Sequence, residues 1–464
     1  MEQKYKILLS NTFVLTIGNA VIKLLAFILM PLYTAVLTTE EYGMAELLNN
    51  LIEIALPIVT LCIVEALFRF SIDSSCDCSE LFRNGIFVVL IGDIFLCIIC
   101  KIIDRFTVAP YMNYFILLYI ANSVYKLFAQ LARGLGEIKK FTCAGVINAG
   151  VLIFCNYIFL VKFGGGVEGY LVSYIIAYFI ASIYVFFSAK EYRLIKFGKI
   201  NLELLKSMLA YGIPNSINML GWWINNVSDR YILLFFYGTG TAGLYTAAAK
   251  LPAMLNLFAT IFQQAWEYSS SKEIEEHNGS TFFTNVFIIY STFCIMVCAF
   301  LNFLIPFISK IVLQGEFYAA WRYVPLLLFA ATLGCFSTYL GTFYCAIKKT
   351  RMAMLSTLAG TSVNIVLNFI LIPRIGIFGA IYSTVICYLI IVIIRIIDTR
   401  KHISYELNVS LFTLELIIIF LESLGMSYLN IKKAMALSAI CIVLLIILNL
   451  KLEKKFWKLI KERR

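Results

Sequence analysis

Charged residues are scarce in this chain. Asp, Glu, Lys and Arg make up 14% of its 464 residues, whereas about a quarter of the residues in a soluble globular protein are charged. Hydrophobic residues reach 61%, and the mean hydropathy is +0.88. This composition excludes a soluble globular protein and predicts an all-α polytopic membrane protein.

Residues that carry enzyme chemistry are also few. The two histidines, His277 and His402, have neither a nucleophile nor a ligand set beside them. The glycine-rich stretch 238–243, GTGTAG, lacks the Gly-Lys-Ser/Thr of a phosphate-binding P-loop. Cys76 and Cys78 lie close together in a loop, but no second pair or nearby histidine completes a metal site. We therefore expect no enzymatic activity, no cofactor and no metal, and we expect ion, potential or substrate gradients to drive any transport.

Long apolar segments recur along the whole chain. Each is long enough to cross the hydrocarbon core of a bilayer. About fourteen such segments are predicted, at residues 8–37, 44–70, 84–103, 108–131, 141–162, 167–188, 208–237, 242–268, 282–308, 322–347, 352–373, 377–398, 408–428 and 434–450. The first residues, MEQKYKILLSNTF, have no apolar core before a small-residue cleavage site, so we expect no removable signal peptide.

Basic residues gather on one side of this predicted topology. With Met1 placed inside, 26 Lys and Arg residues fall in inner loops and termini, 8 in outer loops, and the other four within helices. The positive-inside rule therefore predicts that both termini are cytoplasmic and that the chain is a multi-pass protein of the cell membrane. The net charge of +11 needs no nucleic-acid partner. The basic tail KLEKKFWKLIKERR is expected to anchor the last helix among anionic lipid headgroups.

Two pairs of similar stretches indicate an internal repeat. Residues 35–61, AVLTTEEYGMAELLNNLIEIALPIVTL, resemble residues 235–261, FFYGTGTAGLYTAAAKLPAMLNLFATI. Residues 156–175, NYIFLVKFGGGVEGYLVSYI, resemble residues 368–386, NFILIPRIGIFGAIYSTVI. The matching positions in the second pair are Gly169 with Gly379 and Ser173 with Ser383. Six helices thus repeat as six in parallel orientation, a plan that recurs in secondary transporters with a substrate site between the halves.

The repeat predicts four parts. These are an N-terminal six-helix lobe (1–188), a cytoplasmic amphipathic linker (189–207), a C-terminal six-helix lobe (208–398), and an additional helix pair with a basic tail (399–464). Apolar residues of the linker alternate with Lys and Arg, as in a helix that lies on the cytoplasmic membrane surface. The last helix pair has no counterpart in the repeat.

Polar residues form stripes on three predicted helices. The stripe of the first helix contains Thr12, Thr16, Asn19 and Lys23. The stripe of the second contains Glu46, Asn50, Glu53, Pro57 and Thr60. The stripe of the seventh contains Asn215, Asn218, Trp222, Asn225, Asn226, Asp229 and Arg230. Such stripes do not face hydrocarbon; they either join packed helices, with salt bridges such as Lys23 with Glu53, or line a water-filled central cavity, which we favour.

The charges on the seventh and eighth helices add a further constraint. A charge at the centre of a membrane helix costs about 2.5–3.5 kcal/mol, so it is expected to face a protein interior or a wet cavity. If the outer turn is centred near Gly240, Arg230 and Lys250 each lie ten residues from it, about 15 Å below the outer end. Together with Asp229 they make two cations and one anion, which suits an anionic headgroup. Alternatively, Asp229 and Arg230 neutralise a buried helix contact.

Three stretches resemble a known family. They are PLYTAVLTTEEYGMAELLNNL, VSDRYILLFFYGTGTAGLYTAAAKL and AIKKTRMAMLSTLAGTSVNIVLNFILIPRIGIFGAIYST. Together they resemble the polysaccharide flippases of the multidrug/oligosaccharidyl-lipid/polysaccharide (MOP) superfamily. The resemblance implies two six-helix lobes around a central, commonly basic cavity, and export of undecaprenyl-pyrophosphate-linked oligosaccharide units across the bacterial inner membrane. The candidate cavity residues are Asn19, Lys23, Glu53, Asn218, Asn226, Asp229, Arg230 and Lys250.

The expected partners follow from this resemblance. They are the lipid-linked oligosaccharide itself, membrane lipids, and a polysaccharide polymerase and glycosyltransferases of the same pathway, with the protein acting as a monomer. Two alternatives stay open. A cation-coupled multidrug exporter would favour acidic cavity residues such as Glu53, Glu65 and Asp229. A membrane-embedded polymerase or ligase would need a large catalytic outer loop, whereas the longest one expected, residues 309–321, is short.

Overall fold

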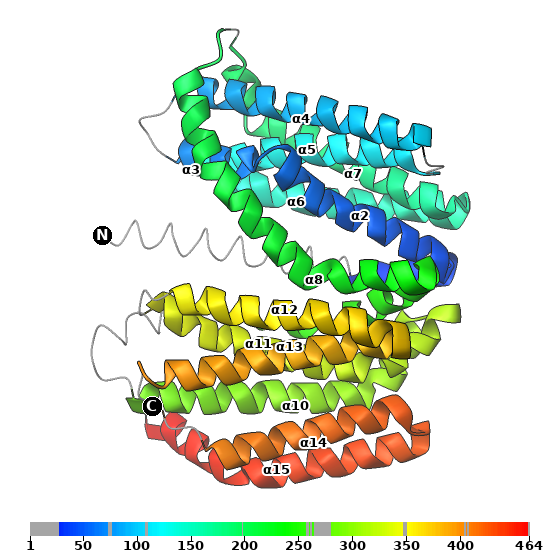
Figure 1. Cartoon of the computed structure of the whole chain (residues 1–464), viewed down its shortest axis with the longest axis vertical. Helices are drawn as coiled ribbons and strands as arrows, with labels where there is room; N and C mark the ends of the chain where they lie inside the picture. Colours follow the sequence, from blue (N-terminus) through cyan, green and yellow to red (C-terminus); the bar gives the residue numbers. More distant parts are fainter. Residues whose placement is uncertain are drawn as a thin grey trace. The chain divides into compact units, whose positions relative to one another are not determined.

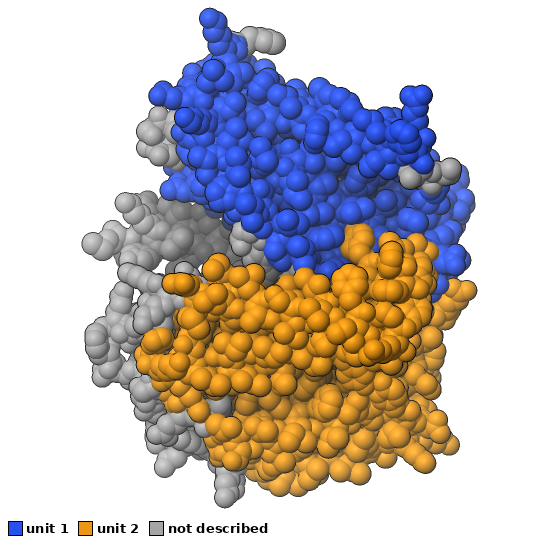
Figure 2. Space-filling model, in the orientation of Figure 1, with its two compact units in different colours: residues 1–228 blue, residues 229–464 orange. Residues whose placement is uncertain are grey.

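The computed structural model describes a helical protein in two compact units, residues 1–228 and 229–464, which Figure 2 colours blue and orange. Its described residues are 27–72, 77–106, 110–196, 198–256, 259, 262–263, 280–346, 350–402, 405 and 408–462. Within them every regular element is helical, which confirms the predicted fold class.

In unit 1 most of the long helices run roughly along one another, and the first part of α8 crosses them obliquely (Figure 1). A short helix covers Phe27–Val36. The following elements are α2 (Thr39–Val59), α3 (Ile63–Ser71), α4 (Cys78–Phe106), α5 (Met112–Gly134), α6 (Ile138–Asn156), the π-helix η1 (Tyr157–Lys162), α7 (Gly166–Ser188), the 3-10 helix η2 (Glu191–Leu194) and the first part of α8 (Leu202–Lys250). Their apolar side chains meet in a core that includes Ile63, Leu67, Phe82 and Met208.

Unit 2 contains the second part of α8 and the remaining helices. These are α10 (Ser280–Val312), the 3-10 helix η3 (Gly315–Arg322), α11 (Val324–Ala346), α12 (Thr350–Ile375), α13 (Ile377–Thr399), α14 (Val409–Tyr428) and α15 (Ile431–Glu462). Helix α13 packs against α11 and α12, while α14 and α15 pack against each other and against α10 (Figure 1).

The number of membrane spans is close to the prediction. Eleven helices of the described chain are long and apolar enough to cross a bilayer, or twelve if the bent pair α2 and α3 makes one span. Fourteen were predicted from the apolar segments. Most of the first predicted segment and the end of the eighth lie outside the described residues.

Helix α2 has a defined start and ends at a sharp break before α3. Thr38 and Glu41 form a reciprocal capping box at the start of α2. Pro57 lies inside α2 near its end, and the backbone then passes through left-handed conformations at Leu61 and Cys62 before α3 begins. The two helices differ in direction by 65°. Left-handed backbone at two non-glycine residues costs energy, so the surrounding packing must hold this break in place.

The repeated stretches make corresponding contacts in the two units. Ser173 donates to the carbonyl of Gly169 at 2.7 Å, and Ser383 donates to that of Gly379 at 2.8 Å. A Cβ atom on Gly169 would lie 3.0 Å from the Phe159 carbonyl oxygen, and one on Gly379 would lie 2.5 Å from backbone atoms of Leu371. In each case a glycine therefore lets two consecutive helices approach at backbone distance.

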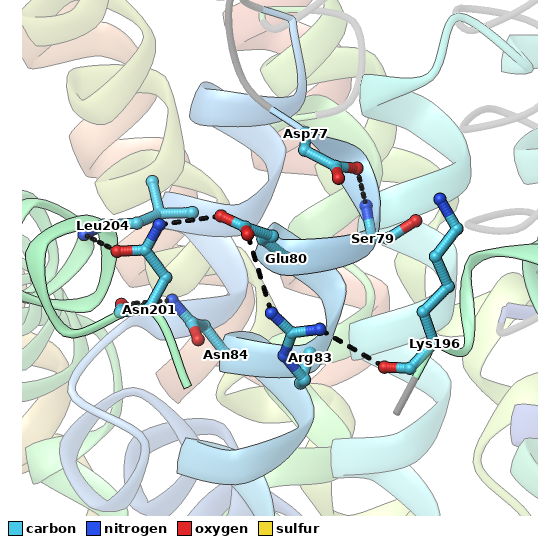
Figure 3. A network of polar contacts seen from close by, with 8 residues as sticks. All are labelled: Asp77, Ser79, Glu80, Arg83, Asn84, Lys196, Asn201 and Leu204. Carbon is cyan, nitrogen blue, oxygen red and sulfur yellow. Dashed lines mark hydrogen bonds and ion pairs between the residues drawn. The ribbon is translucent and has the colours of Figure 1, made fainter. Parts of the chain in front are cut away.

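The predicted linker, residues 189–207, contains a 3-10 turn at Glu191–Leu194, and α8 begins within it at Leu202. Between these two elements the described residues, 195–196 and 198–201, are not helical. Polar contacts with the start of α4 hold this chain (Figure 3). Asn201 donates to Glu80 at 2.7 Å, and its side-chain oxygen accepts from the Leu204 N–H, so Asn201 also caps α8.

Two further contacts fix the first part of α8 within unit 1. The backbone of Gly212 approaches the Leu61 carbonyl so closely that any Cβ atom would collide with it. Trp223 donates its indole N–H to the Asn50 carbonyl at 3.0 Å. The first part of α8 is thus held by α4, by the break after α2 and by α2 itself.

Candidate functional site

The charged pair Asp229 and Arg230 lies on a helical hairpin. The backbone of α8 leaves helical geometry at Gly238, with φ 81° and ψ −179°, close to the outer turn predicted near Gly240. A left-handed φ of this kind favours glycine because it has no Cβ atom. Asp229 and Tyr245 face each other across this turn, since the Tyr245 hydroxyl donates to Asp229 Oδ2 at 2.9 Å.

Asp229 is the hub of a buried polar network in unit 2. Its side chain is 6% exposed. Besides Tyr245, the Thr384 hydroxyl lies 2.9 Å from Oδ2, and the Asn368 amide donates to Oδ1. All three partners are neutral donors, so both carboxyl oxygens act as acceptors, as in an ionised carboxylate. A single carboxyl group thereby joins α8, α12 and α13.

Arg230 makes no comparable contacts. It is half-buried, and no ion pair between Arg230 and Asp229 is found among the described residues. Its Nε atom is buried without a hydrogen-bond partner in the described chain. A buried unpaired donor is costly, and a guanidinium with open donors can bind the oxygens of a carboxylate or phosphate.

Lys250 lies on the second helix of the same hairpin. It is half-buried and lies five residues beyond Tyr245, which is about 7 Å of helix. That Arg230 and Lys250 share one depth stays a prediction.

The remaining predicted site residues are only partly visible. Asn19 and Lys23 lie outside the described residues, and so do the side chains of Asn218 and Asn226. Glu53 is exposed on α2. The possible salt bridge between Lys23 and Glu53 therefore stays a prediction.

A second polar network lies in unit 1, and the sequence did not predict that its residues come together. The Tyr170 hydroxyl donates to Glu46 Oε1 at 3.0 Å, and Asn156 donates to the Tyr33 hydroxyl at 2.8 Å. The Tyr33 and Tyr170 rings are 5.1 Å apart between centroids. Glu46 is 4% exposed. The available signal was the repeat itself, because Asn156 and Asn368 open the two similar stretches and each donates into the network of its own unit.

Within unit 2, buried polar contacts join the additional helix pair, α14 and α15, to each other and to α10. Asn449 of α15 donates to Glu415 of α14 at 2.7 Å and accepts from Thr292 of α10 at 3.1 Å. About two turns along α14 from Glu415, Glu422 accepts a hydrogen bond from Ser438 of α15, and both residues are fully buried. The sequence contains no signal for these contacts, because each polar residue is isolated in an otherwise apolar predicted helix.

These clusters differ in what they can bind. Groups of three or more His, Cys, Asp or Glu side chains able to hold a metal ion are absent from the described parts of the chain. The oxygens of Asp229 are already engaged by three donors. Arg230 is the charged group of the hairpin that keeps an unused buried donor, so the hairpin is suited to receive an anion.

Comparisons with known proteins agree with a transporter fold. A family model described as polysaccharide biosynthesis protein matches residues 8–267. No curated protein matches the chain. The lipid II flippase MurJ, solved in an inward closed conformation, is 15% identical with a TM-score of 0.70, and the match covers 94% of this chain and 98% of that chain.

Two further solved structures belong to the MOP superfamily. An inward-facing multidrug resistance MATE family transporter is 16% identical with a TM-score of 0.66, and the match covers 82% of this chain and 94% of that one. A MOP superfamily transporter from Pyrococcus furiosus, described as having a binding pocket of reverse polarity, is 16% identical with a TM-score of 0.57, over 86% of this chain and 96% of that one. At such identities the likeness shows a shared fold.

Proposed function

The chain belongs to the polysaccharide biosynthesis protein family, and from this premise we propose that it is a flippase for undecaprenyl-pyrophosphate-linked oligosaccharides. It moves these units by alternating access from the inner to the outer leaflet of the bacterial cytoplasmic membrane. The translocated units then enter surface polysaccharide, such as capsule, O-antigen or exopolysaccharide. Both termini are cytoplasmic in this proposal, and a polymerase and glycosyltransferases act on the same lipid-linked units.

The proposal is supported by the difference in hydrogen bonding between the adjacent residues Asp229 and Arg230. Asp229 is buried and satisfied by three neutral donors. Arg230 keeps a buried Nε without a partner among the described residues. Since Asp229 does not consume the donors of Arg230, the guanidinium is available for a pyrophosphate, whose oxygens it can engage two at a time.

The other candidate residues act around this contact in the proposal. Lys250 and Lys23 add positive charge for the pyrophosphate, and the amides of Asn19, Asn218 and Asn226 bind polar groups of the substrate. Glu53 faces the substrate path as an exposed carboxylate. Asp229 orients the hairpin that carries Arg230, through its hydrogen bonds with Tyr245, Asn368 and Thr384.

The same network weighs against the exporter alternative. A cation-coupled multidrug exporter would need acidic groups free to exchange ions, yet Asp229 already accepts three hydrogen bonds. The polymerase alternative gains nothing from the outer segment around η3, which is short and packs Phe317 and Trp321 into the unit. Neither alternative is favoured by a specific contact.

The test replaces the guanidinium. Arg230→Gln removes the charge at similar size, and we expect it to abolish the appearance of lipid-linked units in the outer leaflet while membrane levels stay normal. Arg230→Lys keeps the charge but loses the planar fork, so it should retain only a small part of the activity. Arg374→Gln, at an exposed arginine of α12, is the matched control.

The measurement counts lipid-linked units on each side of the membrane in a strain that lacks the native gene. Flippase loss leaves untranslocated units inside. Accumulation of single translocated units outside would instead indicate a polymerase. Normal translocation by Arg230→Gln at normal protein levels would rule out the pyrophosphate role.

A further inference from the structure

An open cavity lies beside the first part of α8 in unit 1. Its volume is about 370 Å³, and Ala210, Tyr211, Pro214 and Asn215 line it. These residues occupy one and a half turns of α8, shortly after the helix begins at Leu202. Asn215 starts the polar stripe of this helix, so the cavity lies at the end of that stripe nearest the linker.

Pro214 gives the cavity an unusual acceptor. A proline has no N–H, so it cannot donate to the carbonyl of the residue four positions earlier. In α8 that residue is Ala210, which is exposed and lines the same cavity. The Ala210 carbonyl therefore lacks its helical donor at a place where a ligand can supply one.

The polar and aromatic groups around this carbonyl are also available. Asn215 is half-buried, and its amide makes no hydrogen bond with any part of the chain that the structure describes. Tyr211 is 41% exposed, and its ring packs edge-on against Phe70 with centroids 6.3 Å apart. The contact with Phe70 leaves one side of the Tyr211 ring for a ligand.

The opposite side of α8 is held firmly. Gly212 is buried against the Leu61 carbonyl at the break between α2 and α3. This backbone approach needs both the glycine and the left-handed residues at the break. The cavity face of α8 is thus presented by a fixed helix, which lowers the entropy lost when a ligand binds.

The chemistry of the lining excludes two parts of a lipid-linked substrate. A hydrocarbon chain would leave the Ala210 carbonyl and the Asn215 amide unsatisfied. A pyrophosphate has no donor for the carbonyl, and the described lining contains no cation. A sugar fits all three groups, because its hydroxyl or acetamido groups donate and accept, and its C–H face can pack against an aromatic ring.

We propose that this cavity is a saccharide subsite that binds the sugar of the lipid-linked substrate, through the Ala210 carbonyl, the Asn215 amide and the Tyr211 ring. This inference rests on the proposed function for the identity of the lipid carrier. The subsite recognises the glycan part, whereas Arg230 recognises the pyrophosphate. Specificity for the sugar therefore resides in unit 1.

Pro214→Ala is the sharpest test. It restores an N–H that can bond to the Ala210 carbonyl, so the acceptor is lost while the helix is made more regular and should fold at least as well. Asn215→Ala removes the amide. Asn113→Ala, at an exposed position of α5, is the control for loss of an amide.

The purified protein in nanodiscs is titrated with three probes. These are bare undecaprenyl pyrophosphate, the lipid-linked oligosaccharide extracted from a host strain that lacks the flippase gene, and the free oligosaccharide released from that lipid by mild acid. We expect Pro214→Ala and Asn215→Ala each to weaken binding of the two sugar-bearing probes by about tenfold, as for one lost hydrogen bond. Binding of the bare lipid should stay unchanged.

The outcomes separate the subsite from the proposed function. Wild-type affinity of both variants for the sugar-bearing probes would overturn the subsite, and so would failure of the wild type to bind the free oligosaccharide at millimolar concentration. Equal affinity of the wild type for free and lipid-linked oligosaccharide, with no effect of Arg230→Gln, would overturn the lipid-linked function. In that case, weaker binding of the free oligosaccharide by the Pro214→Ala variant would still support the subsite.

Discussion

The network around Asp229 allows a graded prediction, because its three donors differ in what else they can reach. The Tyr245 hydroxyl has Asp229 as its acceptor. The Thr384 hydroxyl also lies 2.9 Å from the Ala380 carbonyl. One hydroxyl proton can serve only one acceptor at a time, so Thr384 shares its proton between Asp229 and the Ala380 carbonyl, whereas the Tyr245 hydroxyl is directed to Asp229 and lies within reach of the Thr384 hydroxyl.

Asn368 serves two acceptors at once. Its amide NH2 group has two hydrogens, and it donates to Asn364 Oδ1 at 3.0 Å as well as to Asp229. A hydrogen bond to a charged group contributes about 1.5–3 kcal/mol in soluble proteins, and side-chain hydrogen bonds in one membrane protein average about 0.6 kcal/mol. We therefore expect Tyr245→Phe to lower the free energy of unfolding by about 1–2 kcal/mol. Thr384→Val should cost about 0.5 kcal/mol or slightly more.

Asp229→Asn should have the largest effect. The asparagine places an N–H₂ group where the carboxylate accepted, so it turns at least one acceptor toward a donor. We expect a loss of about 2–3 kcal/mol, as for one charge-assisted hydrogen bond left unmade. Unfolding in mixed micelles with increasing sodium dodecyl sulfate measures all three variants, and a double-mutant cycle of Asp229→Asn with Tyr245→Phe isolates their interaction.

The order of the effects is the decisive result. Equal losses for Tyr245→Phe and Thr384→Val would show that the alternative acceptor of Thr384 has no influence. An interaction free energy near zero in the double-mutant cycle would show that Asp229 and Tyr245 do not interact across the hairpin. Arg230→Gln serves as the control, because its described contacts predict little effect on unfolding.

Two more predictions concern packing and pH. Gly379→Ala should destabilise the protein by about 2–3 kcal/mol, and by more than Gly169→Ala does. The reason is that the new Cβ atom would lie 2.5 Å from backbone atoms at Gly379 but 3.0 Å from them at Gly169. Gly150→Ala is the control, because its Cβ atom would meet nothing within 4 Å, and equal thermal stability of the three variants would contradict this packing. Burial raises the pKa of Glu191, outside the membrane spans, from 4.5 to about 8, so the folded protein binds a proton there that the unfolded chain releases. The free energy of unfolding should therefore fall as the pH rises from about 4.5 to 8, by up to about 1.4 kcal/mol per unit; Glu191→Gln should remove this dependence, and an unchanged slope in that variant would refute it.

The class of the protein and most of its helices follow from the sequence alone. Apolar segments longer than a bilayer crossing can only be helices there, because hydrocarbon offers no partner for backbone groups. The turn near Gly240 was also predictable, since a glycine after an apolar run permits the backbone break that occurs at Gly238. The resemblance to polysaccharide flippases rested on whole stretches, and the family match over residues 8–267 agrees with it.

The roles of individual polar residues were decided by tertiary contacts. Asp229 and Arg230 are adjacent in sequence, and a pattern of charges suggests that they pair. In the structure, a helix turns by 100° per residue, so the two side chains point in different directions, and Asp229 meets donors from α12 and α13 that lie more than 130 residues away.

The cavity beside α8 shows the same division. The sequence places Pro214 inside a helix and therefore implies a free carbonyl at Ala210. Whether that carbonyl meets another helix or an open space depends on side chains from distant segments. Here Gly212 packs α8 against the break at Leu61. The sequence does not predict the left-handed backbone of that break, because neither Leu61 nor Cys62 is a glycine. The sequence predicts which polar groups are present and where local backbone hydrogen bonds are missing. Which of these groups find hydrogen-bond partners is decided only when distant helices pack together.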